Sequence, residues 1–419
     1  MFITLVRRLK NIPVIFRTAK WLRRCLIPAL ADAVLEFYRS LAAGSWFYLY
    51  SVEKRRKASR VASLLCNIRK GPPFRLFSLY QALRCGCPEF QGRIVLEDQG
   101  FPIVRQGSLL AEGTTTQHTE QPWPIFWSRH RNASLVSQSL GLVFAGKELC
   151  LESVYGFRNY RGDQAARYWK LPPRVALNGL WTSIVSRWAP NDRVTNHSHW
   201  LLDALPRLAL LREFPPDIKV IVPGKLAAYQ KESLSMLGLT DDRIRFSPET
   251  HLQVEDYFFS SPTAMIACYS PYAIRFLRES FLPKANPAYQ PPKRFFVRRT
   301  GLARNMDNEA EVERFFADRG WALINPSELT FAQEIRLFAE AEAVAGMLGS
   351  ALSNTIFSKS DCSVLAIAHD YWTDGSLDWI LQTVGISNYS VHIYPSNRCR
   401  RFSVDLNVLQ KQFDSLGLP

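Results

Sequence analysis

The stretch WALINPSELTFAQEIRLFAEAEAVAGMLGSALSN, residues 321–354, decides the fold class. It opens on a short apolar run at residues 321–324. Thr330 and Gln333 then have the spacing of a capping box, and apolar residues recur behind them at helical spacing. A second apolar run follows at residues 343–347. A strand, a helix and a strand in this order predict a parallel sheet that is covered by helices.

The same alternation continues on both sides of this stretch. Before it, residues 293–298 predict a strand and residues 309–319 a helix with one apolar face. After it, residues 364–368 predict a further strand. These elements extend the parallel sheet of this part of the chain.

An earlier region repeats the pattern. Residues 217–224 predict a strand that ends at Pro-Gly, residues 226–237 a helix, and residues 243–246 another strand. The proline-rich stretch PKANPAYQPP, residues 283–292, separates the two regions and is the expected linker.

The length of 419 residues also favours more than one domain. We therefore expect an α/β protein with two Rossmann-like domains facing each other across a cleft, at residues 90–282 and 293–419, preceded by a helical segment at residues 1–70.

The positive charge of the chain is concentrated at one end. Fifty-two Lys and Arg residues against 37 Asp and Glu residues give a formal net charge of +15. Residues 1–70 carry +12 of this, so the rest of the chain is nearly neutral. A nucleic-acid enzyme would be expected to carry its basic residues around its working cleft. The distribution therefore argues against nucleic acid as a partner.

The basic segment, residues 1–70, has an amphipathic pattern that is interrupted at Pro13 and Pro28. Apolar residues such as Leu5 and Trp21 alternate there with Lys and Arg. This favours helices that lie on an anionic membrane surface, and a helical hairpin packed on the body is the alternative. The pattern predicts neither a secretory signal nor a helix long enough to span a membrane.

The eight cysteines are scattered and include no CxxC pair. Neither a zinc ribbon nor a disulfide framework is predicted, and buried reduced thiols are typical of a cytosolic protein. We expect a cytoplasmic location, peripheral at the inner face of the cell membrane.

Three local motifs carry a resemblance to a known family. They are NHSHWLLDALPRL at residues 196–208, FVRRTGLARNMDNEAEV at residues 296–312 with its continuation NPSELTFAQEIRLFAEAEAV at residues 325–344, and GMLGSALSN at residues 346–354. In this order and spacing they resemble glycosyltransferase family 61, and the resemblance covers roughly residues 90–400.

The resemblance implies a GT-B type fold and inverting transfer of a sugar from a nucleotide sugar, expected to be UDP-linked, to a glycan acceptor. It implies no metal and no cofactor beyond this co-substrate. Surface polysaccharide or capsule biosynthesis is the expected setting. The N-terminal domain would then hold the acceptor and the C-terminal domain the donor.

The donor site is expected at a turn of small residues and at a strand end. Small side chains let a diphosphate approach backbone N–H groups at a helix N-terminus. A guanidinium at a strand end can pair with phosphate in two hydrogen bonds, although a pair of arginines that solvates the strand end is the alternative. The candidates are Arg298, Arg299, Gly349, Ser350, Ala351, Ser353 and Asn354. Asn308 and Glu309 match the family as well but are expected to cap the following helix.

The acceptor side is expected at the first motif, with Asn196 and Trp200. His199 can take the proton of an acceptor hydroxyl, and Asp203, one turn further on, can orient the imidazole or act as the base itself. A structural role for His199 is the alternative. His197 and His199 also form an HxH pair, but no third ligand is near them, so no metal site is predicted.

Two positions depart from the family pattern. Leu348 stands where the loop usually carries histidine, and Ala366 stands where the next strand tends to carry an acidic residue. A lost charged hydrogen bond costs ~1.5 to 3 kcal/mol. The alternative function is therefore a weak or inactive pseudo-glycosyltransferase that binds a glycan or a partner.

Overall fold

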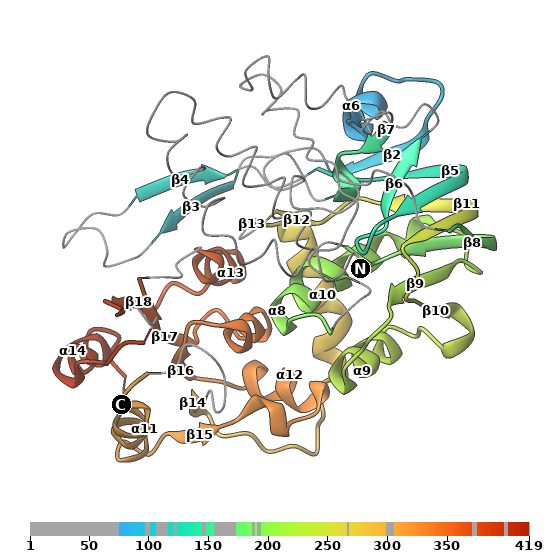
Figure 1. Cartoon of the computed structure of the whole chain (residues 1–419). Coiled ribbons are helices and arrows are strands. Elements are labelled where there is room, and N and C mark those ends of the chain that lie inside the picture. Colours follow the sequence, from blue (N-terminus) through green and yellow to red (C-terminus); the bar gives the residue numbers. More distant parts are fainter. Residues whose placement is uncertain are drawn as a thin grey trace, which may run out of the picture.

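The computed structural model describes residues 75–96, 101–105, 116–120, 124–144, 148–154, 173–186, 189–190, 194–265, 268–298, 306–370, 375–397 and 401–418. They form a mixed α/β structure with two main sheets (Figure 1). We call residues 75–282 the first half and residues 293–418 the second half. The expected membrane-binding helices of residues 1–70 lie outside the described residues. No helix in the described part of the chain is long and apolar enough to cross a membrane.

The second half contains a sheet of five parallel strands in the order β15-β14-β16-β17-β18. The strands are β14 (Arg294–Val297), β15 (Ala322–Ile324), β16 (Ala343–Met347), β17 (Ser363–His369) and β18 (Tyr389–Tyr394). The helices are α11 (Glu309–Ala317), α12 (Phe331–Ala339), α13 (Ser376–Val384) and α14 (Leu406–Ser415). The chain leaves β14 for β15 on one side and crosses to β16 on the other, so the strand order reverses between β14 and β16.

Both faces of this sheet are covered, as its apolar strands require. On one face, Phe316 of α11 stacks on Phe296 with ring centroids 4.7 Å apart, and Phe413 of α14 packs edge-on against Phe315. On the other face, Phe338 of α12 packs edge-on against Phe295. All five residues of β16 are buried between these layers.

The first half contains a sheet of nine strands in the order β1-β7-β6-β5-β11-β8-β9-β10, with β2 also paired to β5. The strands are β1 (Arg75–Phe77), β2 (Gln91–Leu96), β5 (Ile125–Val136), β6 (Gly141–Phe144), β7 (Glu148–Cys150), β8 (Val175–Ser183), β9 (Lys219–Pro223), β10 (Ile244–Ser247) and β11 (His251–Ser260). Two small two-stranded sheets pair β3 (Phe101–Arg105) with β4 (Thr116–Glu120) and β12 (Ala264–Met265) with β13 (Cys268–Tyr269).

This first sheet is mixed, which differs from the parallel sheet expected there. The strands β11, β8, β9 and β10 run parallel, but β5 is antiparallel to β2, β6 and β11. Residues 137–140 form a short turn between β5 and β6, and such a turn connects antiparallel neighbours. The expectation of a parallel sheet was based on residues 217–224 and 243–246, which do not include β5, β6 or β7.

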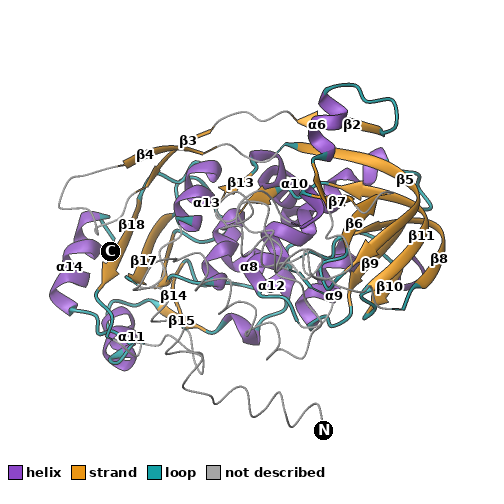
Figure 2. Ribbon diagram, turned by 45° about the horizontal axis from the view of Figure 1, so that its top comes forward, coloured by secondary structure: helices purple, strands orange, loops and turns teal. Residues whose placement is uncertain are grey.

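Helices fill the space between the two sheets (Figure 2). They are the short helix α8 (His197–His199), which continues as a π-turn at Trp200–Ala204 and a 3₁₀ segment at Leu205–Glu213, then α9 (Ala228–Met236), α10 (Pro271–Phe281), α12 and α13. The π-turn precedes Pro206, which has no N–H for a regular helical hydrogen bond. The short helix α6 (Leu79–Arg84) and two 3₁₀ turns, at Glu152–Val154 and Asp241–Arg243, lie elsewhere in the first half, and a further 3₁₀ turn at Leu282–Lys284 follows its end.

One hydrophobic core joins the two halves. Trp200 and Leu205 of the first half belong to the same buried cluster as Phe331 and Phe357 of the second. Phe281 of α10 packs edge-on against Phe331, with ring centroids 5.3 Å apart. The contact between the halves is therefore a packed interface at these residues.

The strands and helices whose bounds were expected within residues 217–368 are confirmed to within two residues at each end, namely β9, α9, β10 and the elements from β14 to β17. The capping box of Thr330 and Gln333 is also confirmed. The expectation for Asn308 was wrong in part. Asn308 lies at the N-cap position of α11, but its side chain bonds the backbone of Val404 and the side chain of Glu311 instead of a helical N–H.

Candidate active site

The small-residue turn follows β16, at the point where the strand order of the second sheet reverses. In open α/β sheets, ligands bind outside the carboxyl ends of the strands at such a point. Gly346 allows close packing just before the turn, because a Cβ there would lie 3.0 Å from the Cβ of Val297 on β14 and would push that residue away. The backbone of Gly349 is extended and leads into the 3₁₀ helix Ser350–Phe357.

The five candidate residues of this turn differ in exposure. Gly349, Ser350 and Ala351 are partly exposed, whereas Ser353 and Asn354 are buried. The exposed part of the turn is therefore its first three residues, which open the 3₁₀ helix.

Arg298 follows β14, the neighbouring strand. Its guanidinium donates two hydrogen bonds to the carboxylate of Glu313 on α11, at 2.8 and 3.1 Å, and its side chain is 38% exposed. The hydrogen bond that Arg298 donates to Glu313 raises the pKa of Arg298 above its usual value. The structure thus places Arg298 at the strand end where it was expected, already paired within its own half. Arg299 lies outside the described residues.

His199 and Asp203 form a hydrogen-bonded pair one turn apart, as their spacing predicts. His199 Nδ1 lies 2.7 Å from Asp203 Oδ2. The Asp203 side chain is only 3% exposed, whereas that of His199 is 33% exposed. A buried carboxylate at Nδ1 fixes the orientation of the ring and its tautomer, so that Nε2 is the basic nitrogen.

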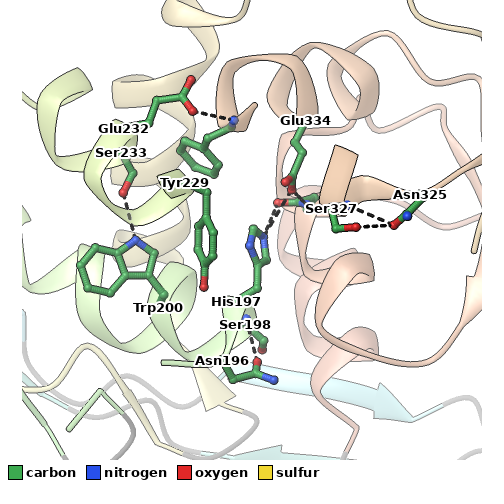
Figure 3. Close-up of polar contacts among 12 residues, drawn as sticks. Asn196, His197, Ser198, Trp200, Tyr229, Glu232, Ser233, Asn325, Ser327 and Glu334 are labelled. Carbon is green, nitrogen blue, oxygen red and sulfur yellow. Dashed lines mark hydrogen bonds and ion pairs between the residues drawn. The ribbon is translucent and has the colours of Figure 1, made fainter. Parts of the chain in front are cut away.

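Asn196 and Trp200 hold this helical turn in place. The side chain of Asn196 accepts a hydrogen bond from the N–H of Ser198 and so caps α8. Trp200 is fully buried, and its indole N–H donates to Ser233 Oγ of α9 at 2.9 Å. Trp200 therefore anchors the segment on the first half and does not face solvent (Figure 3).

His197 points in another direction, toward the second half (Figure 3). Its Nε2 lies 3.0 Å from Asn354 Oδ1, and Asn354 Nδ2 donates to Glu334 Oε2 at 2.7 Å. Burial raises the pKa of the Glu334 carboxyl to about 8, against the effect of the Asn354 hydrogen bond, and the charge of Glu232 adds to the rise. Burial also lowers the pKa of His197. The two histidines of the HxH pair thus have different partners.

The structure brings parts of all three motifs together, because Glu334, in the continuation of the second motif, contacts both Asn354 and His197. The histidine segment, which we define as residues 196–203, meets the small-residue turn through the contact of His197 with Asn354. Glu334 was not among the candidates. A signal for it was present, because Phe331, Glu334, Ile335 and Phe338 follow a helical i, i+3, i+4, i+7 pattern that places this carboxyl on the buried face.

The two departures from the family pattern have different surroundings. Leu348 is partly buried against the shared core, and its N–H donates to Ile367 O of β17. Ala366 is fully buried inside that core in the middle of β17. The methyl group of Ala366 therefore packs in the core.

The structure presents a histidine–carboxylate pair near a small-residue turn at the end of a parallel sheet, and such a pair can perform acid–base chemistry. Comparison with protein families makes this specific. Residues 198–365 match the family model Glycosyltransferase 61, and this range contains His199, Asp203, Arg298 and the small-residue turn. The match indicates a glycosyltransferase domain in this part of the chain. No curated protein matches the chain.

Proposed function

We propose that the protein is an inverting glycosyltransferase that moves a sugar from a UDP-linked or other nucleotide sugar to a hydroxyl of a glycan acceptor. The match of residues 198–365 to this family supports a nucleotide-sugar donor and a glycan acceptor. The observation that carries the mechanism is the pair of His199 and Asp203, in which a buried carboxylate holds a partly exposed imidazole.

In the proposed reaction, His199 Nε2 takes the proton of the acceptor hydroxyl as its oxygen attacks the anomeric carbon. The bond from that carbon to the diphosphate breaks, and the nucleoside diphosphate leaves with the electron pair. Attack from the face opposite the leaving group inverts the configuration. Asp203 keeps the proton on Nδ1 and stabilises the imidazolium that forms.

The proposed donor site is the switch point of the second sheet. There the turn at Gly349 and Ser350 would accept the diphosphate at its backbone N–H groups, and Arg298 would exchange part of its contact with Glu313 for phosphate oxygens. The reaction needs no metal in this scheme, because the guanidinium and the backbone N–H groups supply positive charge to the leaving group.

We further propose a GT-B type division into an acceptor domain at residues 90–282 and a donor domain at residues 293–419. The parallel five-stranded sheet with its strand reversal supports the donor assignment. The basic segment, residues 1–70, would attach the enzyme to the anionic inner face of the cell membrane, where surface polysaccharide precursors would be its acceptors.

The test is a screen of the purified protein with UDP-, GDP- and CMP-sugars for donor hydrolysis and transfer. His199→Ala should lose ~10² to 10⁴ in turnover while donor binding is retained, since general-base catalysis contributes this much. Asp203→Asn should lower turnover by less than His199→Ala does if Asp203 only orients the ring. Normal turnover in His199→Ala would exclude His199 as the base, and absence of turnover with every donor would favour the pseudo-glycosyltransferase.

A further inference from the structure

Three side chains from distant parts of the sequence form a polar chain inside the interface of the two halves. His197 comes from α8, Asn354 from the 3₁₀ helix after β16, and Glu334 from α12. Asn354 is fully buried, and the side chains of His197 and Glu334 are 15% and 7% exposed. A buried polar group without a partner is costly, so each of these contacts constrains the position of the next residue.

The hydrogen bonds among these three side chains indicate which atoms carry protons. Asn354 Nδ2 donates to Glu334 Oε2, so Asn354 Oδ1 faces His197 and accepts a hydrogen bond. His197 Nε2 must therefore carry a proton. The ring of Tyr229 lies beside that of His197, with centroids 5.0 Å apart, and fixes its plane from the other side.

Three ionisable groups act on the Glu334 carboxyl. His197 Nε2 lies 3.7 Å from Glu334 Oε2, Glu232 of α9 contributes a repulsive negative charge, and Tyr229 interacts electrostatically with the carboxyl. Glu232 is held nearby, because it accepts hydrogen bonds from Phe331 N and Ala332 N at the start of α12. Burial and the charge of Glu232 together outweigh the hydrogen bond from Asn354 and favour the neutral carboxylic acid at physiological pH.

We propose that Glu334 is a positioning residue for sugar transfer, which acts through Asn354 and His197 to hold the histidine segment at a fixed distance from the small-residue turn. This inference rests on the proposed function, which places the catalytic base on the histidine segment and the donor at the small-residue turn. His197 and His199 lie on the same helical turn, so a shift of His197 moves His199 as well. Asp203 orients the ring of His199, whereas Glu334 sets where that ring stands relative to the donor.

The decisive variant is Glu334→Gln, because a glutamine oxygen accepts the Asn354 hydrogen bond and cannot ionise. Turnover at pH 7 should stay within about threefold of that of the parent protein. In the parent protein, kcat should fall as the pH rises through about 8, because the ionised carboxylate is unfavourable in this buried site beside the charge of Glu232, and turning toward water would break its contact with Asn354. Glu334→Gln should lack this alkaline fall.

Glu334→Leu should instead lower kcat by about tenfold or more with little change in the donor KM, because Asn354 Nδ2 then has no acceptor. Glu340→Gln is the matched control. Its carboxylate lies at the end of the same helix, pairs with Lys293 near the surface, and should leave the pH profile unchanged.

A measurement without turnover separates this inference from the proposed function. In a protein labelled with ¹⁵N-histidine, His197 should show the Nε2–H tautomer at pH 7, and its signals should change near pH 8 in the parent protein but not in Glu334→Gln. If no nucleotide sugar is turned over, the proposed function fails, but this titration still tests the contacts among His197, Asn354 and Glu334.

The inference is overturned if the alkaline fall and the His197 titration are the same in Glu334→Gln as in the parent protein. It is also overturned if Glu334→Gln loses as much kcat as Glu334→Leu, or if a folded Glu334→Leu has normal kcat. If Glu334→Leu does not fold, the comparison of Glu334→Gln with the parent protein decides.

Discussion

Replacing Glu232 with alanine should weaken the contact between the two halves. The Glu232 carboxylate accepts hydrogen bonds from the N–H groups of Phe331 at 2.8 Å and Ala332 at 3.0 Å, the first two residues of α12. Thr330 Oγ1 accepts from the N–H of Gln333, and Gln333 Oε1 accepts from the N–H of Thr330. All four backbone donors at this helix start therefore have acceptors, and the first half supplies two of them.

The size of the effect follows from these contacts. A hydrogen bond to a charged group contributes about 1.5 to 3 kcal/mol, and a carboxylate at a helix N-terminus about 0.3 to 1 kcal/mol. Glu232 is partly exposed, so water can replace part of what the carboxylate provides. We expect Glu232→Ala to lower the free energy of unfolding by about 2 to 4 kcal/mol.

Urea denaturation followed by tryptophan fluorescence and by circular dichroism measures this change. The free energy of unfolding of Glu232→Gln should lie between those of the parent protein and Glu232→Ala, because glutamine keeps one acceptor oxygen without the charge. Lys231→Ala is the control, since Lys231 is exposed on the same helix, and it should change stability by less than about 0.5 kcal/mol. Equal unfolding midpoints for Glu232→Ala and Lys231→Ala would refute the capping role.

Four other predictions concern separate features. Trp200→Phe removes the hydrogen bond to Ser233 and should cost about 1 kcal/mol of stability in urea denaturation; no change would mean that packing alone holds the ring. Arg298→Ala should weaken the binding of a nucleoside diphosphate at least about tenfold in calorimetry, with unchanged circular dichroism, and unaltered affinity would remove Arg298 from the donor site. Deletion of residues 1–70 should release the protein from anionic vesicles in a sedimentation assay, and equal pelleting of both forms would make the segment structural. Because the folded pKa of Glu334, about 8, is above its unfolded value of 4.5, its contribution to stability is full below pH 4.5 and is lost as the pH rises through 8; denaturation at pH 6 and 9 should show a loss of roughly 1 to 3 kcal/mol that Glu334→Gln lacks.

The sequence predicted those parts of the site that depend on residues close together in the chain. His199 and Asp203 are four residues apart, so a helical turn alone brings them into contact. The turn after β16 and the strand end at Arg298 follow from the alternation of strands and helices. The antiparallel strand β5 was not predicted, because its partner β11 lies more than a hundred residues away and no local pattern encodes that pairing.

The amino-acid sequence by itself determined the parallel sheet of the second half, the capping box of α12 and the family motifs, because periodicity, capping and turn chemistry act over a few residues. Only the tertiary structure decided that His197 meets Asn354, 157 positions later, and that Glu232 caps α12 from the other half. It also decided that Arg298 is paired with Glu313 and that Trp200 is buried. These contacts arise when two sheets and the helices between them pack into one core, and the burial that results sets which carboxyl groups stay neutral.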